Sequence, residues 1–229
     1  MRVLVACESS GAVRDAFIRK GHDAMSCDLL PADKGTDGTH HHQGDVFKLL
    51  AQDTGFDLMV AHPPCTYLAS SSMHWTTRGL RPKVWTTRAL AFFKALLDMP
   101  IPMICIENPV GVPATRIRPP DQYIQPYQFG HLESKKTGLW LKNLPLLLPT
   151  RVMQPPSWGC CHDGEKWDYR LGAKGCPVCR GRHKALPRWN NQDACGQNNV
   201  SGADRWKKRS KTYLGIANAM ASQWGIILP

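Results

Sequence analysis

The chain has 229 residues, 42% of them hydrophobic, so it can bury the core of one domain with a modest insertion and is too apolar to be disordered throughout. Its apolar runs fall short of the ~20 residues of a membrane span, and the first one is typical of a strand, so we expect a cytoplasmic protein without a membrane segment. The net charge is +11, and 16 basic but only 6 acidic residues lie between positions 132 and 211, which predicts a polyanion-binding second part.

Short apolar runs alternate with helical patterns over the first 110 residues. The runs typical of strands are Arg2–Cys7, Asp23–Leu29, Phe56–Ala61 and Pro102–Glu107. The segments with helical spacing are Gly11–Lys20, Val46–Leu50 and Val84–Leu97. This alternation predicts an α/β fold, with an open, mostly parallel sheet and helices on both faces.

Two polar stretches interrupt this pattern. The small polar residues from Ser70 to Trp75 predict a mobile loop. The consecutive imidazoles His40 to His42 do not converge on one metal ion, so we interpret them as a polar loop.

Turn residues become frequent after Pro109, and a hairpin is plausible near Gly138–Leu148. Residues 153–204 are rich in Cys, Trp, Gly and Arg without a clear period, and helical character returns at Ser210–Trp224. We therefore predict one domain formed by residues 1–150 and 205–229, and a small basic insertion at 151–204.

Polar residues follow each predicted strand. Glu8 and Gly11 come after the first strand, Asp28 ends the second, and Asp45 precedes the next helix. A helix N-terminus after strand one can hold a carboxylate or phosphate, and an acid about 20 residues on can accept both hydroxyls of a ribose. The pattern predicts a cofactor that contains a nucleoside.

Cys65 follows two prolines at the end of the third strand. The prolines restrict the backbone, which favours a thiol exposed to the ligand crevice rather than packed in the core. Glu107, one strand over, could hydrogen-bond a ring nitrogen in the same crevice. Most single cysteines are core residues, but this context favours a nucleophile.

Taken in order, these motifs resemble the DNA cytosine-5 methyltransferase family, in a short form of the kind found in phages. The segments that carry the resemblance are Ala6-Cys7-Glu8-Ser9-Ser10-Gly11 for the cofactor loop, Asp28 and Asp45 for the ribose and adenine acids, Pro64-Cys65, Glu107-Asn108-Pro109, Phe129 to Thr137, and Ile216-Ala217-Asn218-Ala219.

The resemblance implies a Rossmann-like methyltransferase sheet, S-adenosylmethionine as cofactor, and double-stranded DNA as substrate with the target base flipped out. It implies three catalytic residues: Cys65, whose thiolate adds to carbon 6 of cytosine, Glu107, which binds N3 and the exocyclic amine, and Lys135, a cation near the flipped nucleotide. The residues implied to bind the cofactor are Cys7, Glu8, Ser10, Gly11, Asp28, Asp45, Val46, Pro63, Asn218 and Ala219.

Several positions depart from the family pattern. Glu8 and Ser10 replace glycines of the cofactor loop, Lys135 and Thr137 replace two arginines, and Ala217 replaces a glycine. These departures leave the donor open between S-adenosylmethionine and an analogue with a substituted methyl group.

The cysteine-rich insertion has the spacing of a small zinc ribbon. Its candidate ligands are Cys160, Cys161, Cys176 and Cys179, with His162 or His183 as substitutes. The alternative is a set of buried thiols among basic residues. In the family this region recognises the target sequence, and its tryptophans suit phosphate contact and base stacking.

Three other functions stay open at this stage. An amino-methyltransferase acting on adenine N6 or cytosine N4 would carry Asp-Pro-Pro-Tyr where this chain has His62-Pro-Pro-Cys65. The others are a catalytically silent zinc DNA-binding protein and transfer to a free nucleotide. We expect the protein to act as a monomer.

Overall fold

A computed structural model describes residues 1–36, 38–159, 166–167, 186–192 and 211–227. The chain divides into two compact units. The first contains Met1–Ile124, Lys136–Leu148 and Ile216–Pro229, and the second contains Gln125–Lys135 and Pro149–Gly215.

The first unit is built on a mostly parallel sheet. Within the described residues its strands are β1 (Arg2–Ala6), β2 (Asp23–Asp28), β3 (His41–Gln43), β4 (Leu58–Ala61), β5 (Met103–Pro109), β6 (Gln122–Ile124) and β7 (Thr137–Lys142), in the order β3-β2-β1-β4-β5-β7-β6. The first five strands are parallel, whereas β7 pairs antiparallel with both β5 and β6. This is the predicted open Rossmann-like sheet.

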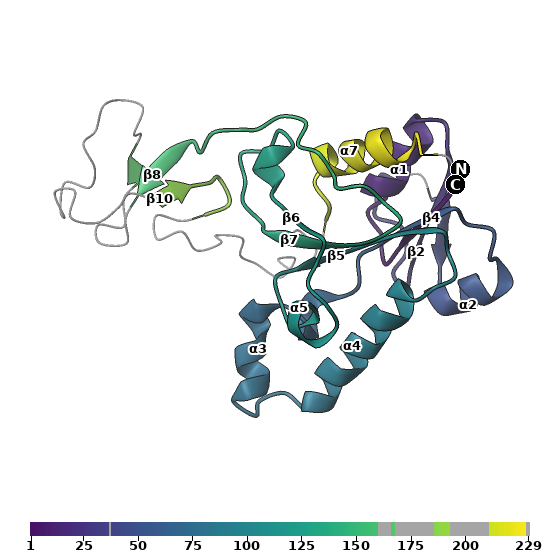
Figure 1. Ribbon diagram of the computed structural model, residues 1–229, viewed down its shortest axis with the longest axis horizontal. Helices are drawn as coiled ribbons and strands as arrows, with labels where there is room; N and C mark the ends of the chain where they lie inside the picture. The colour runs from purple at the N-terminus through teal and green to yellow at the C-terminus, as the bar shows by residue number, and fades with distance from the viewer. Residues whose placement is uncertain (37, 160–165, 168–185, 193–210, 228–229) are drawn as a thin grey trace. The chain divides into compact units, whose positions relative to one another are not determined.

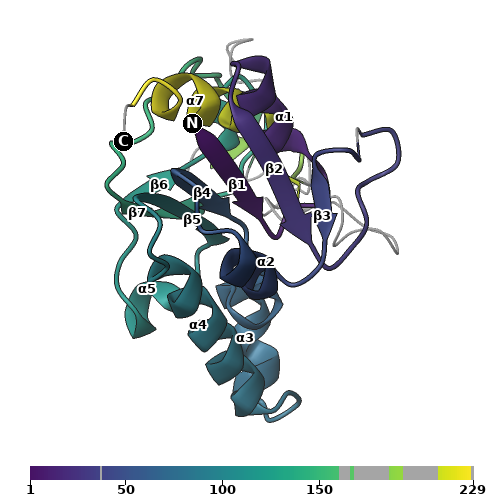
Figure 2. The same cartoon turned by 90° about the vertical axis from the view of Figure 1, so that its right-hand side faces the viewer.

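Helices cover both faces of this sheet (Figures 1 and 2). The face shown uppermost is covered by α1 (Ala12–Arg19) and by residues 216–224 of α7 (Leu214–Trp224). The opposite face carries α2 (Val46–Gln52), α3 (Ser70–Thr77), α4 (Lys83–Leu97) and α5 (Pro113–Arg116).

Alternation along β1 explains why both faces are covered. Leu4 and Ala6 belong to the core beneath α2 and α4, so Val3 and Val5 point to the face that carries α1 and α7. All four side chains are fully buried. A strand buried on both faces needs a continuous apolar run, and this is what the sequence has here.

Trp140 of β7 anchors the core under α4. Its fully buried ring meets Phe93 of α4 edge to face with 5.0 Å between ring centroids, and its Nε1 donates to the Arg118 carbonyl oxygen at 2.8 Å. The buried indole is therefore both packed and hydrogen-bonded. Near the hairpin expected at Gly138–Leu148, β7 pairs antiparallel with β6, the strand before it in the chain, and also with β5.

The two stretches expected to be loops form regular structure. Ser70 to Trp75 lies in α3, where the Ser72 hydroxyl donates to the Ala69 carbonyl oxygen at 2.9 Å. His41 lies in β3, which pairs parallel with β2. Its ring is also bonded on both sides, at 2.9 Å from the Ser26 hydroxyl and 2.9 Å from the Leu30 carbonyl oxygen. Tertiary contacts override local composition in both places.

The second unit joins segments that lie far apart in the sequence. Ser134 and Asn191 exchange two hydrogen bonds, from the Ser134 amide and from the Asn191 side chain. Tyr127 stacks on Trp189 with 4.5 Å between centroids, and Tyr213 donates to Glu133. These contacts place 125–135 and 211–215 in the same compact unit as the segment after Pro149, and the insertion at 151–204 with its recognition role stays a prediction.

A small antiparallel sheet completes what is described of this unit. It contains β8 (Ser157–Gly159), β9 (Lys166–Trp167) and β10 (Leu186–Arg188), in the order β10-β8-β9. None of the helices described here, in either unit, has the length and apolarity that a membrane crossing requires.

Candidate functional site

The strand order reverses between β1 and β4. From β1 the chain moves outward to β2 and β3, and from β4 it moves the other way to β5. In open parallel sheets ligands bind beyond the carboxyl ends of the strands at such a switch point. The site is therefore expected where Cys7–Gly11 leaves β1 and His62–Cys65 leaves β4.

Hydrogen bonds hold the strand ends of this site together. The His62 amide donates to the Ala6 carbonyl oxygen at 2.9 Å, which joins the ends of β4 and β1. The Cys7 amide donates to the Cys27 carbonyl oxygen at 2.7 Å, and the Asn108 side chain donates to the Pro63 carbonyl oxygen at 2.8 Å. Residues from four neighbouring strands thus form one continuous rim.

The loop after β1 supplies the hydrogen-bond acceptors for the first amides of α1. Cys7 and Gly11 have φ values of 58° and 70°, which turn the chain sharply into α1. The buried Glu8 carboxylate accepts from the Val13 amide at 2.9 Å and from the Arg14 amide at 3.3 Å. The N-terminal amides of α1 that would bind an anion are therefore already occupied by a carboxylate of the chain.

Acidic side chains gather beside this loop. Burial together with the charges of Asp28 and Asp45 raises the pKa of the Cys7 thiol to about 12, and the same causes raise the pKa of Cys27 to about 11. Asp28 Oδ1 accepts from the Leu30 amide at 2.9 Å, and Asp45 Oδ1 caps α2. The predicted ribose and adenine acids therefore lie close to the turn after β1.

The turn that carries Cys65 is fixed on both sides. Cys65 begins a 3₁₀ turn directly after the buried Pro63 and the exposed Pro64, and its own side chain is exposed. The following residues bridge to the chain after β5, where the Val112 amide donates to the Leu68 carbonyl oxygen at 2.9 Å. The thiol is thus presented to solvent from a backbone that is held in place.

Glu107 lies at the same rim, near the end of β5. It is only 8% exposed, and its Oε2 lies 2.7 Å from His62 Nδ1. Asn108, next to it, is 1% exposed and holds Pro63 through the bond described above. The strand pair β4–β5 therefore positions an exposed thiol and a nearly buried carboxylate at one end of the sheet.

A hollow among the described residues lies away from this rim. Its volume is about 600 Å³, and it is lined mainly by charged side chains from the end of α4, from β7, and from residues 116–118 at the end of α5. Because Lys142 pairs with Ile104, this hollow lies at the amino end of β5, and we do not assign the site there.

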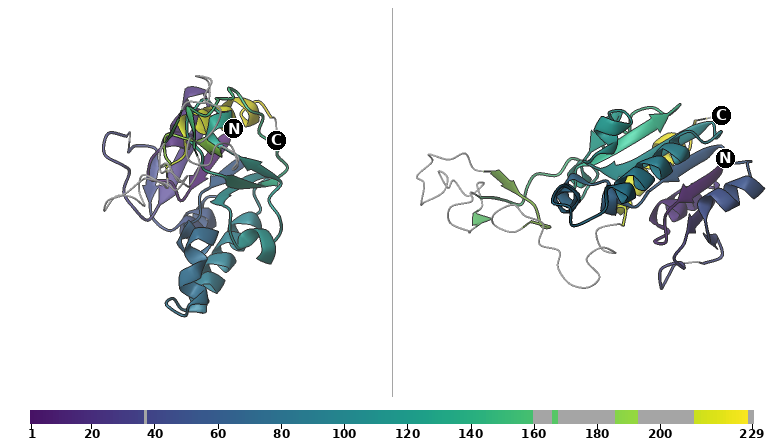
Figure 3. Two further views of the ribbon diagram at one scale, coloured as in Figure 1. Left: turned by 90° about the vertical axis from the view of Figure 1, so that its left-hand side faces the viewer. Right: turned by 90° about the horizontal axis from the view of Figure 1, so that it is seen from below.

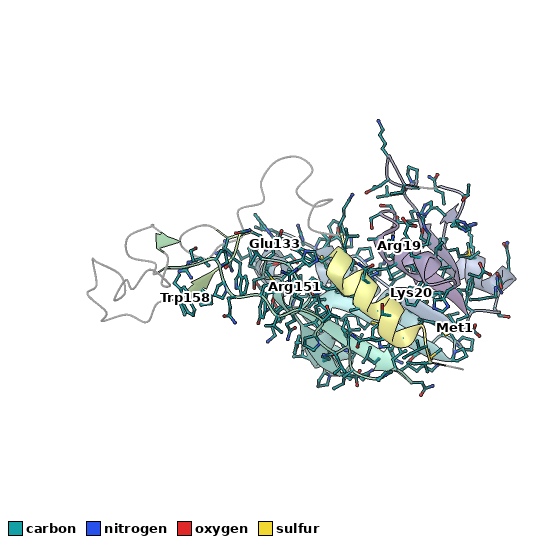
Figure 4. The ribbon with its side chains drawn as sticks, turned by 90° about the horizontal axis from the view of Figure 1, so that it is seen from above. Met1, Arg19, Lys20, Glu133, Arg151 and Trp158 are labelled. Carbon is teal, nitrogen blue, oxygen red and sulfur yellow. The ribbon has the colours of Figure 1, made fainter. Side chains whose placement is uncertain are left out.

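Several predicted site residues lie outside this arrangement. Ala219 is buried in α7. Asn218 accepts a hydrogen bond at 3.0 Å from Arg19, which Figure 4 shows beside α7. Arg19 is in the last turn of α1, so this contact lies away from the N-terminus of α1. Lys135 belongs to the second unit, where its amide donates to Gln125. Their assigned roles stay predictions.

The zinc prediction falls on Cys160, Cys161, Cys176 and Cys179, with His162 or His183, all of which lie outside the described residues. Within the described part of the chain, no three side chains of His, Cys, Asp or Glu come together as metal ligands would.

The difference between Cys65 and the buried thiols predicts selective alkylation. Iodoacetamide at pH 8 should modify Cys65 well before Cys7, Cys27 or Cys105, because a thiol with a pKa near 12 is thiolate in only about one molecule in 10⁴ at that pH. Burial raises the pKa of Cys105 as well. Peptide mass mapping over time gives the order of labelling, and equal rates at Cys7 and Cys65 would contradict the described exposure.

No protein-family model matches the sequence, and neither does any curated protein. Solved structures give weak matches at 14% identity: a DNA modification methyltransferase encoded within an E. coli prophage (TM-score 0.43), the Entamoeba histolytica methyltransferase EhMeth (0.42), and a mutant of DNMT2 from Spodoptera frugiperda (0.39). The matches cover 66–67% of this chain but only 52–57% of those proteins. The chain thus spans about half the length of each.

Sequence reasoning missed two features of the rim. His62 was noted only as a departure from Asp-Pro-Pro-Tyr, although its position directly after a buried strand is a signal for a side chain in the crevice. Gly111 carried no local signal, because its importance lies in its close approach to the carbonyl oxygen of Leu68.

Proposed function

We propose that this protein is a DNA cytosine-5 methyltransferase. It transfers a methyl group, or a related group from an analogue of S-adenosylmethionine, to carbon 5 of a flipped cytosine through a covalent adduct between Cys65 and carbon 6. The observation that carries the proposal is the placement of an exposed Cys65 after β4 and a nearly buried Glu107 near the end of β5, on neighbouring strands beside the switch point of a parallel sheet.

The charge of the rim favours a cationic donor. Glu8, Asp28 and Asp45 are carboxylates around the turn after β1, and Glu8 already occupies the amides of α1 that would bind the pyrophosphate of a dinucleotide. Leu29, directly after Asp28, is 73% exposed and offers an apolar surface to an adenine ring. These residues fit S-adenosylmethionine, which has a ribose and an adenine, a sulfonium and an ammonium, and no phosphate.

In this assignment Asp28 binds the ribose hydroxyls, Leu29 lies against the adenine, and Asp45 approaches the adenine amine. Glu8 contributes negative charge near the cationic end of the donor. When bound, the donor supplies an electrophilic methyl group.

The chain's own residues then make carbon 5 nucleophilic. The Cys65 thiolate adds to carbon 6, which moves the electron pair of the 5,6 double bond toward carbon 5 and builds charge on N3. Glu107 stabilises that charge when it holds a proton toward N3, and its other oxygen accepts from the exocyclic amine. After transfer the proton on carbon 5 is removed, and Cys65 leaves as thiolate.

The α3–α4 hairpin supports a polymer substrate rather than a free nucleotide. The two helices follow one another along the chain, beginning a few residues after Cys65 (Figure 3). Residues 58–97 contain five basic and no acidic side chains, and Arg78, Lys83 and Arg88 are exposed. Trp75 and Trp85 are 43% and 40% exposed among them, which is a combination suited to phosphates and bases.

Charge reversal on this hairpin should weaken DNA binding. Arg78→Glu combined with Arg88→Glu is expected to raise the dissociation constant by roughly 10- to 10³-fold at physiological salt, because ion release at phosphates supplies much of the affinity. Fluorescence anisotropy over a salt series measures this, and the slope of log K against log salt should become shallower by about 0.9 per lost contact.

Lys20→Glu is the control, since Lys20 is exposed just after the last turn of α1. An equal loss of affinity from a single Arg88→Glu and from Lys20→Glu would assign the effect to net charge and contradict a specific hairpin contact.

Mass spectrometry of nucleosides tests the function directly. DNA incubated with the enzyme and donor should yield 5-methylcytosine, or a cytosine heavier by the transferred group. Modified adenine or N4-methylcytosine would identify an amino-methyltransferase, and unmodified DNA with retained binding would identify a silent DNA-binding protein.

A further inference from the structure

A nearly buried histidine contacts the carboxylate of the proposed site. His62 Nδ1 lies 2.7 Å from Glu107 Oε2, and the two side chains are only 11% and 9% exposed. Ala61 at the end of β4 pairs with Ile106 of β5. His62 and Glu107 are the next residues on the two strands, so the register of β4 against β5 brings them together.

The partner of Nδ1 fixes where the imidazole carries its proton. A carboxylate oxygen accepts hydrogen bonds and does not donate them when ionised, so Nδ1–H must be the donor at this distance. Imidazole is also the side chain whose ordinary titration falls between about pH 5 and 8. The pair can therefore hold one transferable proton next to the reacting base.

The proposed reaction needs that proton. Addition of an anionic thiolate to carbon 6 leaves negative charge on the ring, and an ionised Glu107 at N3 would face this charge without relieving it. A proton delivered to N3 removes the conflict. A titratable group in contact with Glu107 must then supply the proton during addition and accept it again during elimination.

We propose that His62 is a positioning residue that serves as the proton store for Glu107; this rests on the proposed cytosine-5 chemistry. As the sulfur–carbon bond forms, a proton passes from His62 Nδ1 to Glu107 and from Glu107 to N3. The imidazolium becomes neutral and the ring adduct carries no net negative charge. On elimination the thiolate leaves, N3 loses its proton to Glu107, and His62 is protonated again.

Other titratable groups border the pair and must be separated from it. The neighbouring strand ends carry Cys7 and Glu8 after β1, Cys65 after β4 and Cys105 in β5, whereas the facing residues of β7, from Gly138 to Trp140, are not titratable. Cys65 must ionise for addition, so it makes the rate rise with pH. Because an imidazole that has lost its proton cannot supply one, a role of His62 as proton donor makes the rate fall at higher pH.

The pH dependence of adduct formation with DNA containing 5-fluorocytosine tests this role. Wild-type protein should show a rate that rises and then falls with pH. In His62→Asn the amide nitrogen can still donate to Glu107 but holds no transferable proton, so the rate should drop roughly 10²-fold and lose the decrease at high pH. His62→Ala should behave similarly, and His22→Asn, which lies before β2, should match wild type.

Each outcome decides the question. A His62→Asn variant with the wild-type rate, or with a lower rate that keeps the decrease at high pH, would reduce His62 to a structural support and overturn the proposal. If the variants do not fold, ¹⁵N-histidine spectra of the wild-type protein still test it, because a His62 without a proton on Nδ1 excludes the transfer. A wild-type protein that forms no adduct would instead refute the cytosine-5 chemistry itself.

Discussion

Replacing Cys65 by serine is expected to abolish cytosine modification, with a loss of at least roughly 10⁴-fold in rate, while DNA binding and folding are retained. Serine is nearly isosteric, but its hydroxyl is far less acidic than a thiol and a far weaker nucleophile toward carbon 6. The side chain is exposed, so the substitution leaves the core untouched. Transfer of labelled methyl to DNA measures the loss, and denaturing electrophoresis should show no adduct with 5-fluorocytosine DNA.

Cys105→Ala is the matched control, because it removes a buried sulfur from β5 without altering the exposed turn. It should still form the adduct, with only a modest loss of stability as a small cavity opens. A Cys65→Ser variant that still methylates DNA would favour an amino-methyltransferase, since direct transfer to an amine needs no thiolate.

Gly111→Ala is expected to displace the turn that carries Cys65, although Gly111 is not itself one of the proposed site residues. A β-carbon at position 111 would overlap the backbone carbonyl oxygen of Leu68, and a backbone atom cannot turn aside as a side chain can. The chain after β5 and the turn after Cys65 meet here through the Ala69–Gly111 bridge, so one of them must shift. We expect a loss of about 1–3 kcal/mol in unfolding free energy and a slower Cys65 adduct.

Urea unfolding and the adduct assay measure the two effects separately. Gly38→Ala is the control, because a β-carbon there meets nothing closer than the Ala32 side chain at 4.0 Å. If Gly111→Ala retains both wild-type stability and wild-type adduct rate, the close packing between Leu68 and Gly111 is not what holds the turn.

The sequence by itself determined β1, β2, β4 and β5, which are four of the five parallel strands described here. Runs such as residues 3–6 and Leu58–Ala61 are continuously apolar because those strands are buried on both faces, and a local signal of that kind survives without tertiary information. The sequence also placed Asp28, Cys65 and Glu107 at or just beyond the carboxyl ends of strands, and in a parallel sheet all such positions fall at one end.

Long-range contacts decided the rest. Short strands such as β3 and β6 gain their hydrogen bonds only from neighbours already in place, so their own residues carry little signal. Whether His62 meets Glu107 depended on the register of β4 against β5, because a one-residue slip would turn either side chain to the other face. Sequence spacing fixes which residues end a strand, whereas pairing between strands fixes which of them touch.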